Sequence, residues 1–335
     1  MPIRRSFPAS ERTDPCNLCE GTRFLRVSDV DRRGHLLETV LCQACGLVSH
    51  GAIPSDEELS EYYEGQYRQD YHGEFIPSPY RVLREWKRGE QLVALLGHRL
   101  PSAARVMEIG SGIGCTVKNF ELAGFQASGI EPGQGFCQFS RQQLQANIDP
   151  SSLEHLPGKA DQDLVLLVHV LEHLNDPSKA LRQLRELMSE NGLCYIEVPN
   201  FSGPHAAPGK QFHFAHIYNF TPFTLSMLAE SNGMVIQQLI SAPSDKNLQI
   251  LLSRGPLPSD GEKARVDPES FSNSTRALTQ YSSLGYHLRW RYLRDRVSTL
   301  LRHGGNRWRA SARLDKLLQR CQAERSHPGS SRQAA

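Results

Sequence analysis

The chain has 335 residues, of which 39% are hydrophobic and 22% charged, and its formal net charge is +2. This length allows one large domain or two smaller ones, and the composition is typical of globular proteins. The charge neither favours nor excludes a polyanionic partner, and no window holds the roughly 20 apolar residues of a membrane span. Because the basic N-terminal stretch lacks the apolar core of a secretory signal, we expect a cytoplasmic protein.

The N-terminal part of the chain predicts a small metal-binding module. Residues 1–14 are expected to be a flexible leader, and residues 15–50 a compact block in which strands over 22–27 and 36–41 flank a polar turn. Two CxxC pairs bracket these strands: Cys16, Cys19, Cys42 and Cys45. In a reducing compartment, paired CxxC units indicate metal ligands sooner than disulfides.

Thiolates at i and i+3 on a tight turn can face one ion, so the two pairs can supply four sulfur ligands in a tetrahedron. Gly21 and Gly46 follow the pairs, where we expect left-handed backbone. We therefore predict a structural zinc site, with a redox pair or an iron site as alternatives. A closed four-sulfur site leaves no open coordination position, so we expect no metal catalysis there.

Residues 51–102 are expected to form a helical linker or lid. Ser55 with Glu58 three residues later predicts a helix with a capping box, and residues 80–100 carry apolar side chains at helical spacing. A tyrosine-rich stretch lies between these two segments.

From residue 103 to 254, short apolar strands alternate with helical segments. Strands are expected at 105–110, 125–132, 163–173, 193–200, 234–241 and 248–254, and helices at 114–124, 135–146, 177–192 and 221–233. This alternation predicts an α/β fold with a doubly wound, mainly parallel sheet, in which we expect seven strands in all.

Three glycines at alternate positions follow the first of these strands: Gly110, Gly112 and Gly114. A strand, a glycine-rich turn and a helix together place a nucleotide at a helix N-terminus. The dinucleotide fingerprint G-x-G-x-x-G is not met, because Cys115 stands where its third glycine would be. No G-K-[ST] of a phosphate-binding loop follows. The loop therefore predicts a site for another kind of nucleotide. The alternatives are a nicotinamide enzyme and a tight turn that binds no nucleotide.

The stretch EIGSGIG resembles the first motif of class I S-adenosylmethionine (SAM) dependent methyltransferases. The resemblance implies a Rossmann-like domain, SAM as cofactor, and a second acid after the next strand that accepts hydrogen bonds from both ribose hydroxyls. The stretch GIEP supplies Glu131 at that place. The loop residues implied as cofactor contacts are Glu108, Gly110, Ser111, Gly112 and Gly114.

Further segments resemble the same family. The segment after the third strand frames the adenine in these enzymes, and its nearest positional matches are Ser152 and Leu153. The stretch LEHLNDP resembles the loop after the fourth strand, and His169 at the end of that strand is a further cofactor-site candidate. Tyr67 and Tyr71 could form a lid over the methionine end of SAM.

The order of CxxC, CxxCGLV, an acidic helix, YRQDY and the SAM domain is similar to methyltransferases of bacterial surface-polysaccharide and deoxysugar pathways, over roughly residues 15–253. This resemblance implies a polar small-molecule or glycan acceptor, sugar-linked and attached to a nucleotide or lipid carrier. Sugar C-methyltransferases of that group carry a second α/β domain, whereas this chain continues into a basic helical extension over residues 255–335.

A hydroxyl or carbon acceptor must lose a proton, and an imidazole titrates near neutral pH. The stretch HxxHxYNFTPxxL resembles the acceptor-facing loop of the sugar-pathway enzymes. We predict His216 as the general base with assistance from Tyr218, and His213 and His173 are further candidates.

From Arg276 onward the chain has 13 lysines and arginines and three acidic residues. A docked amphipathic helix with solvated arginines is the simplest interpretation. The arginines could instead bind phosphates of the acceptor, an anionic membrane surface, or RNA.

The leading interpretation is therefore a SAM-dependent methyltransferase that acts on a polar metabolite or glycan. An RNA methyltransferase and a catalytically silent SAM-binding scaffold protein are the alternatives. RNA is disfavoured because HVLEH matches neither the proline-proline-aromatic motif of base N-methylating enzymes nor the Pro-Cys nucleophile of cytosine enzymes. The acceptor atom and the oligomeric state are not determined by the sequence.

Overall fold

The computed structural model of the chain describes residues 7–62, 77–156, 161–203, 206–257, 265–280, 283–290, 293–294 and 309–323. Contacts divide the chain into two compact units. The first unit comprises Met1–Glu61, Gly158–Asp161 and Val165–Arg294, and the second comprises Tyr62–Pro157, Gln162–Leu164 and Asp295–Ala335.

A seven-stranded sheet confirms the expected α/β fold. Its strands are β4 (Arg105–Ile109), β5 (Gln126–Ile130), β6 (Ile148–Asp149), β7 (Gln162–Val168), β8 (Met188–Pro199), β10 (Met234–Leu239) and β11 (Asn247–Arg254). They follow the order β10-β11-β8-β7-β4-β5-β6. The pairs β4–β5 and β5–β6 are parallel, whereas β10–β11 and β11–β8 are antiparallel.

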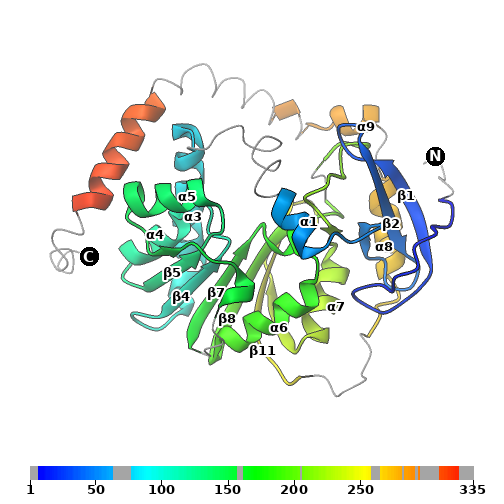
Figure 1. Ribbon diagram of the computed structural model, residues 1–335, viewed down its shortest axis with the longest axis horizontal. Helices are drawn as coiled ribbons and strands as arrows, with labels where there is room; N and C mark the ends of the chain where they lie inside the picture. Colours follow the sequence, from blue (N-terminus) through cyan, green and yellow to red (C-terminus); the bar gives the residue numbers. More distant parts are fainter. Residues whose placement is uncertain are drawn as a thin grey trace. The chain divides into compact units, whose positions relative to one another are not determined.

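In the second unit, three helices lie beside β4 and β5 (Figure 1): α3 (Pro79–Leu96), α4 (Cys115–Leu122) and α5 (Gln134–Phe139). The predicted helix over 80–100 is confirmed as α3, which buries a stripe from Val82 to Leu96 at helical spacing. The helix α3 approaches α4 closely at Gly89, where a Cβ atom would lie 2.7 Å from Asn119 Nδ2. A helix also covers residues 309–323 in this unit.

In the first unit, α6 (Pro177–Leu187) and α7 (Pro222–Ser231) flank the antiparallel part of the sheet. The helix α6 begins at Asp176, whose side chain accepts the Lys179 N–H, and α7 begins with a capping box at Thr221. The helix α6 ends at Leu187, five residues before the expected 192, because β8 already begins at Met188. The Met188 carbonyl accepts a hydrogen bond from Arg254 Nη1 on β11.

The N-terminal module of the first unit contains a four-stranded sheet of order β1-β2-β3-β9. The expected strands are confirmed as β1 (Phe24–Val30) and β2 (Leu36–Cys42), and α1 (Asp56–Glu61) begins with the expected capping box of Ser55 and Glu58. The short strands β3 (Val48–His50) and β9 (Tyr218–Asn219) were not expected. The strand β9 comes from residues 103–254, which are expected to form the SAM domain, and it pairs with β3 of the N-terminal module.

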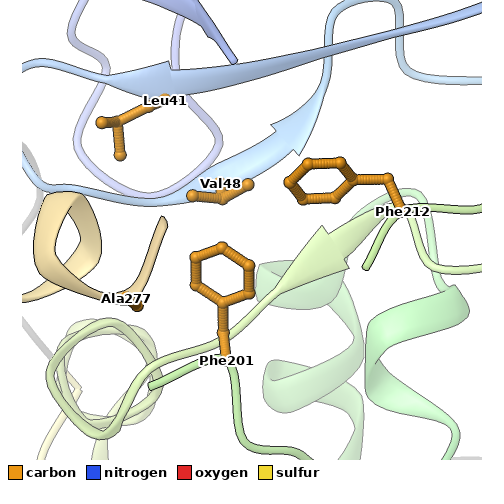
Figure 2. Close-up of a cluster of buried hydrophobic side chains, with 5 residues drawn as sticks. All are labelled: Leu41, Val48, Phe201, Phe212 and Ala277. Carbon is orange, nitrogen blue, oxygen red and sulfur yellow. The ribbon is translucent and has the colours of Figure 1, made fainter. Parts of the chain in front are cut away.

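A hydrophobic core joins this module to the segment after β8 (Figure 2). It contains Leu41 and Val48 from β2 and β3, Phe201 and Phe212 from that segment, and Ala277 from α8 (Ser270–Thr279). The helix α8 lies along the module (Figure 1), and the Ser270 hydroxyl donates to the Cys45 carbonyl at 2.6 Å. The short helix α9 (Ser283–His287) follows α8. Within the described residues, the structure contains no helix long and apolar enough to cross a membrane.

Candidate functional site

The loop after β4 has left-handed backbone at three alternate positions. The φ angles are 66° at Gly110, 53° at Gly112 and 78° at Gly114, a region that side-chain-bearing residues rarely adopt. A Cβ atom at Gly112 would meet no heavy atom of the described residues within 4 Å, whereas one at Gly114 would lie 2.7 Å from the Ser140 hydroxyl. Gly112 therefore leaves open space for a ligand, and Gly114 permits close packing beneath the loop.

Glu131 follows β5 directly and holds this loop. Its Oε2 accepts the Gly112 N–H at 2.9 Å, and its Oε1 accepts the Gly133 N–H at 2.7 Å. A carboxylate offers about four lone-pair sites, so each oxygen can accept one further hydrogen bond. Two neighbouring hydroxyls of a ribose match these two acceptors. The open space at Gly112 and the acceptor pair of Glu131 fit the nucleoside part of SAM.

Glu108 lies within β4 and only 4% of it is exposed. Burial raises the pKa of this carboxyl to about 8, opposed by a hydrogen bond from Thr116. Its Oε2 has no hydrogen-bond partner among the described residues.

Ser111 lies in the loop after β4, and its hydroxyl donates to the Ile130 carbonyl at 3.3 Å. Its side chain fits against Gly129 and so packs between β4 and β5.

The expected adenine segment forms a short helical turn, η4 (Leu153–His155). Leu153 is buried, and the Ser152 hydroxyl lies 2.8 Å from His155 Nδ1. Their contact with adenine stays a prediction. The lid candidates Tyr67 and Tyr71 lie outside the described residues.

The four cysteines of the N-terminal module converge on one point. Their Sγ atoms all lie within 4.8 Å of one another, with Cys16–Cys45 and Cys19–Cys42 each at 3.6 Å. Zinc–sulfur bonds of about 2.3 Å in a tetrahedron place neighbouring sulfurs roughly 3.8 Å apart. All four are free thiols. Hydrogen bonds among the four thiols raise the pKa of Cys16 and Cys45 and lower the pKa of Cys19 and Cys42. The donor set fits zinc.

The two CxxC turns repeat the same backbone pattern with one difference from our expectation. The Cys16 N–H donates to the Gly21 carbonyl, and the Cys42 N–H donates in the same way to the Leu47 carbonyl. Gly46 precedes Leu47 in the second turn, so its equivalent in the first turn is Glu20, which precedes Gly21. Both have left-handed backbone, with φ of 75° and 59°. The expectation that Gly21 is left-handed was wrong. Its role is close approach, because a Cβ atom there would lie 3.3 Å from the Sγ atoms of Cys19 and Cys42.

A second cluster in the first unit gathers histidines around the carboxylate of Glu172. This residue lies in the turn η5 (Leu171–His173) and is 1% exposed. From its Oε1, the distances are 3.3 Å to His169 Nδ1, 3.7 Å to His173 Nε2 and 3.9 Å to His216 Nε2. Glu172 Oε2 has no hydrogen-bond partner among the described residues. The ring of His213 packs against that of His216, with 3.8 Å between centroids and a tilt of 48° between the planes. Of the predicted residues, His169, His173, His213 and His216 are therefore brought together.

His173 and His50 have defined orientations in this part of the structure. His173 Nδ1 lies 2.6 Å from the Ala215 carbonyl, and His50 Nε2 lies 3.4 Å from the His213 carbonyl. A carbonyl oxygen only accepts, so each of these nitrogens carries a proton. Burial lowers the pKa of His173 and lowers that of His50 to about 4, so both rings are neutral near pH 7.

His169 directly follows β7 and has left-handed backbone, with φ 56°, which is unusual for a residue with a side chain. Its N–H donates to the Glu197 carbonyl, and its Nε2 faces Asn247 Nδ2 at 3.3 Å and Glu197 Oε1 at 3.5 Å. Glu197 is 3% exposed and also accepts from Tyr195 and Gln249. The sequence analysis missed Glu197 and Asn247, although an acid inside the apolar strand CYIEVP was a visible signal.

The N-terminal module with the four cysteines, called the zinc module below after its predicted metal, supports the segment that carries His213 and His216. The strand β3 pairs with β9, the His50 N–H donates to the Ile217 carbonyl, and the Arg32 N–H donates to the Phe212 carbonyl. Tyr218 is 1% exposed and its hydroxyl donates to the Asn175 carbonyl at 2.8 Å, while burial raises its pKa. This geometry gives Tyr218 a packing role and does not favour assistance to the base.

The comparisons with known proteins agree with the function predicted from the glycine loop. A family model described as a methyltransferase domain matches residues 80–239, which include the loop, Glu131 and the histidine cluster. Over these residues, just under half of its length, the chain is similar to methyltransferase domains.

Curated relatives match only part of their own length. An uncharacterized protein of Mycobacterium tuberculosis is 26% identical over 134 residues, which cover 37% of this chain and 44% of that protein. A tRNA U34 carboxymethyltransferase of Idiomarina loihiensis is 26% identical over 169 residues, covering 47% and 50%, respectively. The same enzyme of Edwardsiella ictaluri is 31% identical over 140 residues, covering 38% and 43%. The chain thus spans about half or less of these relatives.

Solved methyltransferases are distantly similar. The 1,6-didemethyltoxoflavin N1-methyltransferase of Burkholderia thailandensis is 17% identical with a TM-score of 0.48, covering 66% of this chain and 96% of that one. The magnesium protoporphyrin IX methyltransferase of Synechocystis, with bound S-adenosylhomocysteine, is 17% identical with a TM-score of 0.45, covering 60% and 100%. Their acceptors differ from each other and carry no conclusion for this chain.

Proposed function

We propose that this methyltransferase domain is active and transfers a methyl group from SAM to a polar small-molecule or glycan acceptor, sugar-linked, in the cytoplasm. The observation that carries the proposal is the open left-handed loop at Gly112 beside the two acceptor oxygens of Glu131. Backbone that approaches a ligand closely, next to a carboxylate that can accept from two adjacent hydroxyls, is suited to a nucleoside.

SAM, when bound, supplies a methyl group that is already activated on a sulfonium. The residues of the chain then have three tasks: the glycine loop and Glu131 hold the ribose, Ser152 and Leu153 frame the adenine, and a histidine takes the proton of the acceptor. His216 and His213 are the proposed bases, and His216 Nε2 lies 3.9 Å from the carboxylate of Glu172.

The zinc in this proposal is structural. Four thiolates complete its coordination, and the folded module holds β9 and the histidine segment in place.

The test supplies purified, zinc-loaded protein with methyl-labelled SAM and an extract of its source organism, and follows label through nuclease, protease and glycan or small-molecule fractions. Label in the glycan or small-molecule fraction supports the proposal and provides material for locating the methyl group. Label in none of the fractions, with SAM binding intact, indicates the catalytically silent scaffold and contradicts the proposal.

RNA is a second candidate acceptor, favoured by one specific observation. Several matching relatives are tRNA U34 carboxymethyltransferases, at 26–31% identity over less than half of this chain. Arginines of the C-terminal extension, such as Arg289 and Arg313, could contact phosphates. In the same fractionation experiment, nuclease-sensitive label would favour RNA over a glycan.

A further inference from the structure

The carboxylate of Glu172 and two imidazole nitrogens form a cluster whose geometry is not explained by a proton-transfer role alone. One ligand-type atom each from Glu172, His173 and His216 lies within 4.8 Å of the other two. The distances from Glu172 Oε1 to the two Nε2 atoms, 3.7 Å and 3.9 Å, are too long for hydrogen bonds. They are close to the roughly 3.4 Å that separates tetrahedral ligands about 2.1 Å from one ion.

Within the part of the chain that the structure describes, one oxygen of the buried carboxylate lacks a partner, whereas the other lies 3.3 Å from His169 Nδ1. Glu172 is 1% exposed, and its Oε2 has no hydrogen-bond partner among the described residues. A buried carboxylate oxygen without a partner is costly, and buried charges in proteins are paired or coordinate metals. The two imidazoles and this carboxylate come from the turn after β7 and from the segment before β9, so the fold brings them together from distant parts of the sequence.

The orientation of His173 indicates what faces the carboxylate. Its Nδ1 donates to the Ala215 carbonyl at 2.6 Å, so Nε2 is the ring nitrogen that faces Glu172 Oε1. Histidines that ligate metals almost always donate their other ring N–H to a carbonyl or carboxylate in this way.

We propose that Glu172, His173 and His216 bind one divalent transition-metal ion. Two imidazole nitrogens and one carboxylate are a donor set for such ions, and three protein ligands leave coordination positions open. His169 Nδ1, at 3.3 Å from Glu172 Oε1, donates to the carboxylate and orients it, as the Ala215 carbonyl orients His173.

The consequence for catalysis rests on the proposed function. An ion with open positions binds oxygen and lowers the pKa of a bound hydroxyl, so the acceptor class is a hydroxyl compound. The hydroxyl proton passes to His213, since His216 Nε2 is then a ligand. The acceptor oxygen forms the bond to the methyl carbon as the carbon–sulfur bond breaks, and the electron pair of that bond stays on sulfur as S-adenosylhomocysteine is released.

The experiment titrates the full-length, zinc-loaded protein with Mn²⁺ alone and follows free Mn²⁺ by electron paramagnetic resonance. Mn²⁺ discriminates between the two sites, because it takes carboxylate oxygen as a ligand whereas four thiolates select zinc. We expect one Mn²⁺ per chain, and at least tenfold weaker binding in Glu172→Gln, His173→Ala and His216→Ala. His98→Ala, which removes an exposed histidine of the second unit, is the matched control and should bind Mn²⁺ normally.

A second measurement covers the case in which a variant does not fold. Electron-spin-echo modulation of Mn²⁺ bound to the unaltered protein should show nitrogen coupling from coordinated imidazole. Absence of Mn²⁺ binding up to millimolar concentration, absence of nitrogen coupling, or unchanged affinity in all three folded variants would overturn the metal site. Because metal binding, SAM binding and methyl transfer are measured separately, loss of transfer with Mn²⁺ bound would refute the proposed function and leave the metal site standing.

Discussion

The glycine loop and the histidine cluster are built in different ways. The glycine loop is one short stretch, Glu108 to Gly114, completed by Glu131 at the end of the next strand. The histidine cluster is assembled from the end of β7, from β8 and β11, and from a segment that is held by the zinc module. The first depends on local backbone geometry, whereas the second depends on the tertiary packing of the first unit.

This difference has a consequence for how the two parts should fail. Damage to the zinc module should remove the histidine cluster and leave the glycine loop intact. Damage to the glycine loop should remove SAM binding and leave the cluster intact. Four experiments probe the two parts, and the one with the largest expected effect comes first.

Removal of zinc by a chelator, or Cys42→Ser, should abolish methyl transfer. The binding free energy of a structural zinc is of the order of 10 kcal/mol and is coupled to folding of its module, which holds β9 and the histidine segment. SAM affinity, measured by calorimetry, should stay within about threefold, since the glycine loop and Glu131 belong to the second unit and the cysteines to the first. Re-addition of zinc after chelation is the control. A parallel loss of SAM binding would show that the two parts are not independent.

Glu108→Gln should change the pH dependence of stability. Burial raises the pKa of Glu108 from 4.5 to about 8. The folded state therefore binds more protons than the unfolded state between these values, and the free energy of unfolding falls as pH rises through this range. A shift of this size corresponds to roughly 3–5 kcal/mol. In urea denaturation, the variant should gain stability over the unaltered protein as pH rises from 4.5 to 8.5; a constant difference would contradict the buried-acid assignment.

Glu131→Ala should weaken SAM binding by about 100-fold, because two hydrogen bonds to a charged acceptor are lost. The Mn²⁺ affinity of the histidine cluster should not change. Glu186→Ala, an exposed acid on α6, is the matched control and should bind SAM normally. SAM affinity within a few fold of normal in Glu131→Ala would remove this residue from the cofactor site.

Gly46→Ala should destabilise the first unit by about 2–3 kcal/mol. The residue has φ 75°, and the new Cβ atom would lie 2.7 Å from the Ser270 carbonyl oxygen on α8. Gly34→Ala is the control, because it has φ 92° with nothing within 4 Å of the new atom, and should cost about 1 kcal/mol. Equal effects in thermal denaturation would mean that the contact between α8 and the zinc module carries no energy.

The sequence predicted the features that depend on neighbouring residues. The α/β alternation, the capping box at Ser55 and the glycine-rich turn between a strand and a helix are local, and the structure contains them. The short strand β9 was not predictable, because two residues show no periodicity and their partner β3 is about 170 residues away. The role of Glu172 depends on a cluster that exists only after folding. The misassignment of Gly21 arose because a glycine next to a turn can serve close approach as well as left-handed backbone.

The left-handed backbone of His169 has an evolutionary consequence. A side-chain-bearing residue in this conformation costs about 1–2 kcal/mol, and glycine there would remove most of that cost. The chain therefore retains a less stable residue at the point where β7 meets the buried carboxylates of Glu172 and Glu197. Laboratory selection for heat resistance alone should replace His169 early, and the heat-resistant descendants should be poor methyltransferases.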